Sequence, residues 1–311
     1  MILAVFFGWL TFSRLPISEI IPYFKTANYW WIGLGVIFGI LSHLSRAYRW
    51  NYMLKPMGYS IKTPNSIMAI FIAYLANFGI PRSGEVLRAA VATNYEKIPF
   101  EKSFGTIVAE RVFDVIMVLL ICVVTLFFQF DFIYNILIEK FNPTKIIVVL
   151  LSLSLLFVLV VFYIKKSKGK IANKIKGFLG GLLEGITSVI KMENKGVFIF
   201  HTVFIWVMYI LMFYITSFSL PELQGAPFSS IIVAFIAASF TVATTNGGVF
   251  FYPVAVMSAL ALFGLAEEPS YAFGWIIWTS QTVMIIVFGI LSFIYLPIFN
   301  KKRDLEIKGN L

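Results

Sequence analysis

The chain has 311 residues, of which 59% are apolar and only 13% are charged. A soluble enzyme cannot present so apolar a composition to water, so this class of protein is excluded. The formal charge of +10 fits the lysines and arginines that collect in the cytoplasmic loops of membrane proteins, and we expect no nucleic-acid partner.

Charge-free runs predict the membrane-spanning helices, since about 18 or more such residues can cross a bilayer. The runs cover residues 1–13, 26–45, 63–81, 115–130, 146–164, 196–221, 223–266 and 269–300. The first run is short and lacks the features of a signal peptide, so we expect a first helix whose start is clipped. The run at 115–130 is long enough only if its helix begins before Arg111.

The distribution of lysine and arginine predicts the orientation. Residues 165–195 hold eight of them and residues 301–311 hold four, whereas the loops around Glu222 and Glu267 hold none. We therefore expect both termini on the cytoplasmic side of the membrane. Apolar residues recur at helical spacing among the lysines of residues 168–190, which predicts an amphipathic connecting helix on the cytoplasmic leaflet.

Two of the runs are interrupted by glycine or proline. The break at residues 81–84 separates an apolar piece, 63–80, from a second piece, 85–94, that is too short to cross. This pattern predicts a helical hairpin that enters from the cytoplasm. The break at residues 246–248 joins pieces at 228–245 and 249–264 and predicts a hairpin that opens to the outside. Oppositely oriented broken helices mark binding sites in transporters, although close helix packing remains an alternative explanation of the breaks.

Together these elements predict an all-α polytopic membrane protein with about six crossing helices and two oppositely oriented re-entrant or broken hairpins. We expect one transmembrane domain over residues 1–311. Its first half, residues 1–164, contains hairpin 63–94, and its second half, residues 196–300, contains hairpin 228–264. Residues 165–195 connect the two halves, and residues 301–311 form a tail.

The two breaks predict a phosphate-binding site. In each hairpin the second helix begins at the tip, where free N–H groups and the positive end of the helix dipole attract an anion. Ser83 and Asn246 are expected N-caps, and the neighbouring glycines let the backbone approach a ligand. Arginine adds a guanidinium fork that matches phosphate oxygens. The candidate residues for binding a lipid headgroup are Arg82, Ser83, Gly84, Glu85, Arg88, Asn246, Gly247 and Gly248.

A supporting charge network is expected beside the first hairpin. Its candidate members are Arg46, Arg49, Glu110, Arg111 and Asp114. A charge at mid-depth of a bilayer costs about 2.5–3.5 kcal/mol, so each must be paired or face a polar cavity. Glu110 and Asp114 lie four residues apart on one helix face and can pair with the hairpin arginines, or the group can serve only as a salt-bridge network that holds the hairpin.

The arginine pair at positions 46 and 49 has two interpretations. With Tyr48 and Trp50 in an aromatic belt, Arg46 and Arg49 are positive-inside anchors. Alternatively they form an access site for a headgroup and act together with Arg82.

The sequence offers no enzyme site. His43 and His201 lie alone in apolar helices, where packing or hydrogen bonding explains a histidine better than a metal does. No phosphate-binding loop, nucleophile elbow or zinc-protease motif occurs. The single cysteine, Cys122, gives neither a disulfide framework nor a cysteine-based metal site. We expect no cofactor and no metal.

Three motifs resemble the lysylphosphatidylglycerol synthetase/flippase transmembrane family. They are Ser45-Arg-Ala-Tyr-Arg-Trp50, Pro81-Arg-Ser-Gly-Glu-Val-Leu-Arg88 and Ala109-Glu-Arg-Val-Phe-Asp114. Asn246-Gly-Gly-Val249 is similar to the second glycine-rich break of that family, where a proline usually precedes the glycines. The resemblance runs over nearly the whole chain.

The resemblance implies a protein of the bacterial cytoplasmic membrane that moves a phospholipid or a polyprenyl-linked lipid between leaflets. Members that attach lysine to the lipid carry a further soluble domain, and this chain ends fourteen residues past Pro297, so we expect no aminoacylation. The expected mechanism is an alternating-access cavity between the hairpins. Two alternatives stay open, a secondary transporter of a small polar solute and a scaffold for a membrane glycosyltransferase or lipid-modifying enzyme.

Overall fold

A computed structural model describes residues 17–130 and 192–309, apart from Asn246, together with isolated positions between 131 and 191. Within these residues every regular element is a helix. The α-helices are α2 (Ile17–Thr26), α3 (Tyr29–Leu54), α4 (Thr63–Gly79), α5 (Ser83–Glu96), α6 (Phe100–Phe128), α10 (Lys195–Ser217), α11 (Phe228–Thr244), α12 (Phe251–Ala261) and α13 (Glu267–Gly309). Two short 3₁₀ turns, η1 (Lys55–Met57) and η2 (Pro221–Leu223), follow α3 and α10.

The chain divides into two compact units. One comprises Met1–Glu110 and Glu193–Leu311, and the other comprises Arg111–Met192. Helix α6 begins in the first unit and continues into the second. The first unit contains both predicted hairpins and is described below. The predicted connecting helix at 168–190 lies outside the described residues.

Long apolar helices confirm the prediction of a polytopic membrane protein. In the described part of the chain, α6, α10 and residues Glu267–Lys301 of α13 are each long and apolar enough to cross a bilayer. The pair formed by α2 and α3, bent by 89°, adds a fourth candidate. These four correspond to the predicted crossings at 26–45, 115–130, 196–221 and 269–300. The predicted crossings at 1–13 and 146–164 lie outside the described residues.

Helix α3 extends beyond the charge-free run at 26–45 and includes the arginine motif at residues 45–50. Asn28 caps its start by accepting a hydrogen bond from the backbone N–H of Trp30 at 3.0 Å. The helix then continues to Leu54, nine residues past the end of the charge-free run at residue 45. The side chains of Trp30 and Tyr48 are 74% and 48% exposed. They lie about 27 Å apart along the helix axis, close to the roughly 30 Å thickness of a hydrocarbon core, as expected for two aromatic belts.

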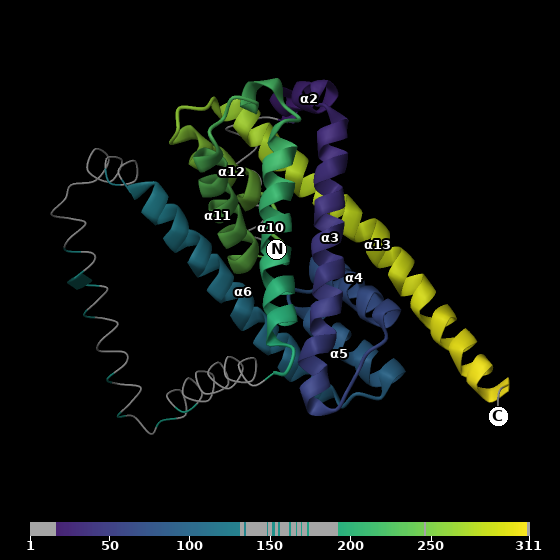
Figure 1. Cartoon of the computed structure of the whole chain (residues 1–311). Coiled ribbons are helices and arrows are strands. Elements are labelled where there is room, and N and C mark those ends of the chain that lie inside the picture. The colour runs from purple at the N-terminus through teal and green to yellow at the C-terminus, as the bar shows by residue number, and fades with distance from the viewer. Residues whose placement is uncertain are drawn as a thin grey trace. The chain divides into compact units, whose positions relative to one another are not determined.

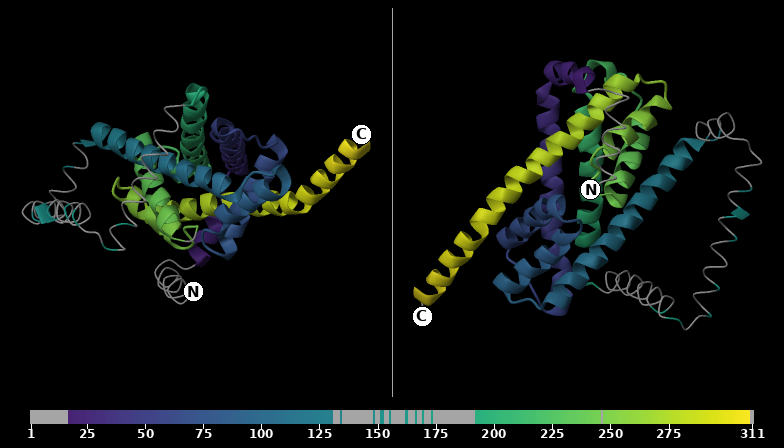
Figure 2. Two further views of the ribbon diagram at one scale, coloured as in Figure 1. Left: turned by 90° about the horizontal axis from the view of Figure 1, so that it is seen from below. Right: turned by 180° about the vertical axis from the view of Figure 1, so that it is seen from behind.

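Both interrupted segments are helical hairpins. Helices α4 and α5 pack against each other near one end of α3 and α10, and α11 and α12 pack near the other end (Figures 1 and 2). Gly84 makes the first hairpin tight, because a Cβ at this position would overlap with the backbone carbonyl of Ala73. This glycine therefore serves the close packing that the sequence analysis left open as an alternative.

The tips of the two hairpins meet inside the first unit. The ring of Phe78, near the end of α4, lies 3.6 Å from the position that a side chain on Gly247 would occupy. Gly247 and Gly248 have φ angles of +68° and +74°, which favour glycine. The indole N–H of Trp278 in α13 donates to the carbonyl of Gly247 at 2.8 Å. The second break is thus held against both the first hairpin and the last helix.

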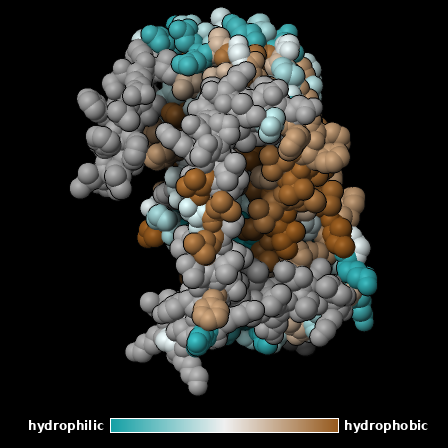
Figure 3. Space-filling view, turned by 90° about the vertical axis from the view of Figure 1, so that its left-hand side faces the viewer, coloured by the Kyte–Doolittle hydropathy of each residue, from teal (hydrophilic) through white to brown (hydrophobic). Residues whose placement is uncertain are grey.

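One face of the molecule shows the surface expected of a membrane protein. On the face drawn in Figure 3, apolar side chains gather between hydrophilic side chains at the two ends. Large apolar side chains are exposed along the predicted spans, for example Leu41 in α3, Val203 in α10 and Val287 in α13. Lipid tails cover such surfaces in a bilayer.

A buried amide pair joins the base of the first hairpin to α13. Asn65 and Asn300 donate to each other's carbonyl oxygens at 3.0 and 2.9 Å. Asn65 also donates to the carboxylate of Glu96 at 2.6 Å, so both helices of the hairpin share this junction. Both asparagines are buried.

We expect Asn65→Ala to lower the free energy of unfolding by about 1–3 kcal/mol, because the amide of Asn300 is left buried with unmet hydrogen bonds. Chemical denaturation in detergent, followed by circular dichroism, measures the difference. Asn94→Ala is the matched control, because Asn94 is exposed on the same hairpin. Equal stability of the two variants would contradict the prediction.

Candidate functional site

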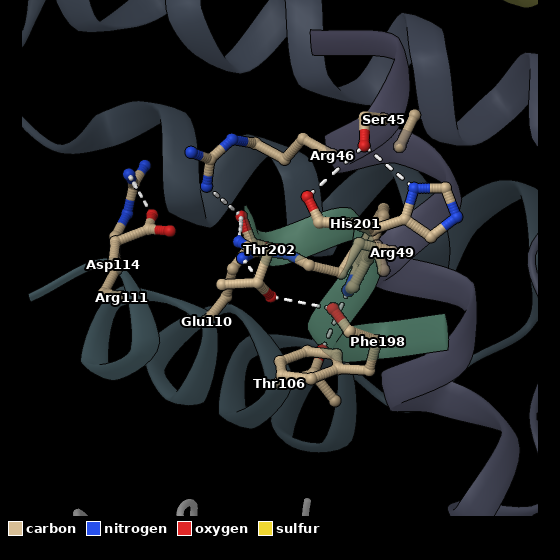
Figure 4. Close-up of polar contacts among 12 residues, drawn as sticks. Ser45, Arg46, Arg49, Thr106, Glu110, Arg111, Asp114, Phe198, His201 and Thr202 are labelled. Atoms are coloured by element: carbon tan, nitrogen blue, oxygen red, sulfur yellow. Dashed lines mark hydrogen bonds and ion pairs between the residues drawn. The ribbon is translucent and has the colours of Figure 1, made fainter. Parts of the chain in front are cut away.

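Three arginines converge on one glutamate in the first unit. Arg46 and Arg49 lie one turn apart on α3, Arg88 lies on α5, and Glu110 lies on α6. Figure 4 shows the side chains of Arg46 and Arg49 from α3, Thr202 from α10 and Glu110 from α6 gathered in one place. We call Arg46, Arg49, Arg88 and Glu110 the arginine cluster.

Both carboxylate oxygens of Glu110 are engaged. Oε1 lies 2.5 Å from Nη1 of Arg46 and 3.3 Å from Nη2 of Arg49. Arg88 binds this carboxylate in a bidentate manner, with Nη2 at 2.9 Å from Oε2 and Nη1 at 3.3 Å from Oε1. Such paired contacts fix the planes of both groups and are among the stronger hydrogen bonds of proteins.

Further polar contacts position the two arginines of α3. Nη1 of Arg49 donates to the hydroxyl of Thr202 at 3.0 Å, and this hydroxyl donates to the carbonyl of Phe198. Nη2 of Arg46 lies 3.5 Å from the hydroxyl of Tyr209. Thr202 and Tyr209 lie seven residues apart on α10, which places them on one face of that helix. Neither residue was predicted from the sequence, although two hydroxyl-bearing residues at this spacing in an apolar helix indicate a polar face.

Aromatic rings lie against two of the arginines. The guanidinium of Arg88 lies over the ring of Trp50, 4.1 Å from its centroid, and that of Arg49 lies 5.6 Å from the centroid of Phe198. The indole N–H of Trp50 donates to Thr106 at 2.9 Å, which fixes the ring. Cations over aromatic faces are stabilised by the ring quadrupole.

The cluster is buried, and this corrects one interpretation of the sequence. Arg46 and Arg49 are 3% and 0% exposed, and Trp50 is fully buried. The interpretation of these arginines as headgroup-level anchors is therefore wrong, because an anchoring side chain has to reach the water interface. Of that group only Tyr48 is exposed. The sequence suggested anchors because both arginines lie beside aromatic residues at the end of this helix.

The first hairpin tip differs from the predicted capping arrangement. Arg82, not Ser83, occupies the N-cap position of α5, with φ = 62°. Ser83 is the first helical residue, and its hydroxyl donates to the carbonyls of Ala76 and Ile80. The amide of Gly84 donates to the side chain of Asn77 at 2.9 Å. The expected N-cap is thus wrong, and two of the expected free N–H groups, those of Ser83 and Gly84, already have partners.

Arg82 combines a strained backbone with an exposed side chain. A non-glycine residue with positive φ costs about 1–3 kcal/mol and is often found at functional sites. Arg82 precedes Arg88 by six residues, or about 9 Å along the axis of α5. Two levels of positive charge therefore follow the first hairpin, one at its tip and one in the arginine cluster.

The second hairpin tip has no charged side chain among its described residues. Helix α12 begins at Phe251, two residues later than predicted, with Phe250 at the N-cap position and φ = 65°. The amide of Gly248 donates to the hydroxyl of Thr245 at 3.1 Å. The predicted N-cap Asn246 lies outside the described residues. Both hairpins thus place a non-glycine residue with positive φ directly before their second helix.

The remaining predicted residues take separate places. Glu85 is partly buried in the first turn of α5. Arg111 and Asp114 belong to the second unit, where they form an ion pair with each other at 3.6 Å on α6 (Figure 4).

The two histidines have packing and hydrogen-bonding roles. His43 is buried beside the ring of Tyr74, 4.8 Å between centroids. Nδ1 of His201 lies 2.8 Å from the hydroxyl of Ser45. Among the described residues no group of three or more possible ligands is placed to hold a metal ion.

Comparison with known proteins gives the family. The family model described as lysylphosphatidylglycerol synthase TM region matches residues 1–302. Glycosyltransferase AglD of Haloferax volcanii is 29% identical over 102 residues, which are 32% of this chain and 16% of that protein. The UPF0104 membrane protein MJ1595 of Methanocaldococcus jannaschii is 27% identical over 117 residues, which are 37% of this chain and 35% of that protein.

The matched segments span only minor parts of both relatives. No solved structure matches the chain significantly. The family match, by contrast, extends over nearly the whole sequence and includes both hairpins and the three helices that carry the arginine cluster, α3, α5 and α6. The chain therefore belongs to the family of the lysylphosphatidylglycerol synthase transmembrane region.

Proposed function

We propose that the protein moves a lipid with a phosphate-bearing headgroup between the two leaflets of a membrane. The observation that carries this proposal is the arginine cluster, in which three buried guanidinium groups share the single carboxylate of Glu110. These four side chains together carry more positive than negative charge. Charges within a membrane protein are costly and mark substrate pathways, and an arginine-rich site suits phosphate oxygens.

The depth of the cluster supports a lipid ligand. Arg46 and Arg49 flank the exposed Tyr48 along α3, and this end of the helix is the one that the charge pattern assigns to the cytoplasm. An exposed tyrosine of this kind lies at the level of the headgroups. The cluster is thus at the height where a lipid phosphate resides, but inside the protein.

The two levels of positive charge support movement rather than static binding. A headgroup released from the arginine cluster has Arg82 as its next cationic partner, about 9 Å further along α5. Near the same tip, the ring of Phe78 approaches the second hairpin. Interrupted helices that meet in this way are typical of transporters that expose one site alternately to the two sides.

The decisive experiment measures lipid transfer by the purified protein in vesicles that contain a fluorescent phosphatidylglycerol. Arg88→Ala is expected to lower the initial rate at least about 30-fold, because truncating one member of a buried charged group costs about 2 kcal/mol or more. Unlike a change of Glu110, this substitution leaves the carboxylate paired with Arg46 and Arg49. Size-exclusion chromatography and thermal unfolding confirm that the variant is folded.

Two further variants make the result specific. Lys102→Ala removes one exposed positive charge from α6 and should transfer lipid at the wild-type rate. Arg88→Lys keeps the charge but loses the bidentate contact, so its rate should lie between those of Arg88→Ala and the wild type. Wild-type rates in folded Arg88→Ala would reject the proposed site.

A second candidate function is a membrane scaffold for a glycosyltransferase. The relative named glycosyltransferase AglD, which is 29% identical over part of its length, favours it. In that case the protein would co-purify with such an enzyme, and the Arg88→Ala variant would retain its function in cells.

A further inference from the structure

The groups that bind ammonium ions are already occupied within the arginine cluster. Proteins hold a cationic headgroup with carboxylates or with the faces of aromatic rings. Glu110 is the carboxylate of the cluster, and both of its oxygens contact guanidinium groups. The rings of Trp50 and Phe198 lie under Arg88 and Arg49. An incoming ammonium group would have to displace an arginine from each of these positions.

The cluster retains capacity for a hydrogen-bond acceptor. Nε of Arg88 is buried and has no hydrogen-bond partner among the described residues. A guanidinium N–H can only donate, so the group that would satisfy it is an acceptor such as a phosphate oxygen. This observation is independent of the net positive charge of the cluster, and it also points to an anionic ligand.

We propose that the transported lipid carries a net negative headgroup without an ammonium group, such as a phosphate ester with a hydroxylated substituent. This inference rests on the proposed function. Zwitterionic and aminoacylated lipids are poor substrates on this view. A positive group that enters next to three guanidinium groups is repelled, and such like-charge contacts cost several kcal/mol.

The test compares lipids in otherwise identical vesicles with the purified full-length protein. The probes are phosphatidylglycerol, phosphatidylethanolamine and lysyl-phosphatidylglycerol, each with the same fluorescent acyl chain. The initial rate for phosphatidylglycerol should exceed the other two rates at least about tenfold. Lys102→Ala should show the same order of rates, and Arg88→Ala should lower the rate for phosphatidylglycerol most.

The outcomes separate this inference from the proposed function. Transfer of phosphatidylethanolamine or lysyl-phosphatidylglycerol as fast as phosphatidylglycerol, with loss in Arg88→Ala, would overturn the inference and leave the translocase standing. No transfer of any lipid above protein-free vesicles would overturn both.

Free inorganic phosphate could bind the cluster by the same chemistry as the headgroup, so the test includes a separate assay for it. Vesicles loaded with radiolabelled inorganic phosphate should retain it equally with and without protein. Efflux that requires the wild-type protein and disappears in Arg88→Ala would assign the cluster to inorganic phosphate and overturn the inference.

Discussion

Replacing Glu110 with glutamine is expected to lower the free energy of unfolding by about 3–5 kcal/mol, because it leaves buried guanidinium groups without their carboxylate. The side chain of glutamine has nearly the same shape, so the loss reports the charge and not a cavity. Arg46, Arg49 and Arg88 all contact this carboxylate, and the three helices that meet there lose a common partner. Denaturation in detergent, followed by circular dichroism, measures the loss.

Glu101→Gln is the control for this prediction. Glu101 lies in the first turn of the same helix and is exposed, so its replacement should change the stability by less than about 0.5 kcal/mol. Should Glu110→Gln unfold under the same conditions as Glu101→Gln, the carboxylate would not be the centre of the cluster. The proposed anion site would then lose its physical basis.

The helices and hairpins were predictable because they depend on local properties of the sequence. Hydropathy gave the spans of α3, α6, α10 and α13, and proline and glycine gave the breaks between α4 and α5 and between α11 and α12. The start of α6 at Phe100 confirms the expectation that this helix begins before Arg111.

The partners of the charged residues were less predictable, since they come from distant parts of the chain. Arg46 and Glu110 are separated by 64 residues, and Arg49 and Thr202 by 153. Spacing along one helix places Arg46 and Arg49 on one face, but it does not say whether that face meets water or another helix. In the structure α5, α6 and α10 bury this face of α3, and the anchor interpretation is wrong for that reason.

The helix starts at the hairpin tips were mispredicted for a different reason. Serine is a favoured N-cap, but capping depends on the backbone conformation, and Arg82 takes the left-handed conformation that ends the turn. Asn77 supplies the side-chain acceptor from the end of the preceding helix. A cap from outside the helix itself has no fixed spacing that a sequence pattern could detect.

The two halves of the described unit follow the same order with different chemistry. A long helix, two short helices and another long helix occur as α3–α6 and again as α10–α13. In α10 the only charged residue is Lys195 at its start, whereas α3 carries the two buried arginines. The proposed anion site is thus built in one half, and the second half contributes hydroxyls and the glycine-rich tip. If the protein is the proposed translocase, this asymmetry leaves one tight binding site among the described helices.

Gly84→Ala is expected to lower the free energy of unfolding by about 1–3 kcal/mol or more, as overpacking does in a dense interior. The added methyl group would overlap with the carbonyl of Ala73, and a backbone atom cannot rotate away as a side chain can. To accommodate it, α4 and α5 must separate, which shifts Arg88 relative to Glu110. We therefore expect lipid transfer to fall together with stability, as measured by vesicle assays and unfolding in detergent.

Gly79→Ala provides the matched control in the same hairpin. No atom lies within 4 Å of a Cβ at Gly79, so this substitution should preserve both stability and transfer. A Gly84→Ala protein that is stable yet inactive would show that the backbone of Gly84 itself contacts the headgroup, as the sequence first suggested. A protein that is stable and fully active would mean that the hairpin is looser than the contact with Ala73 requires, and that its packing does not position Arg88.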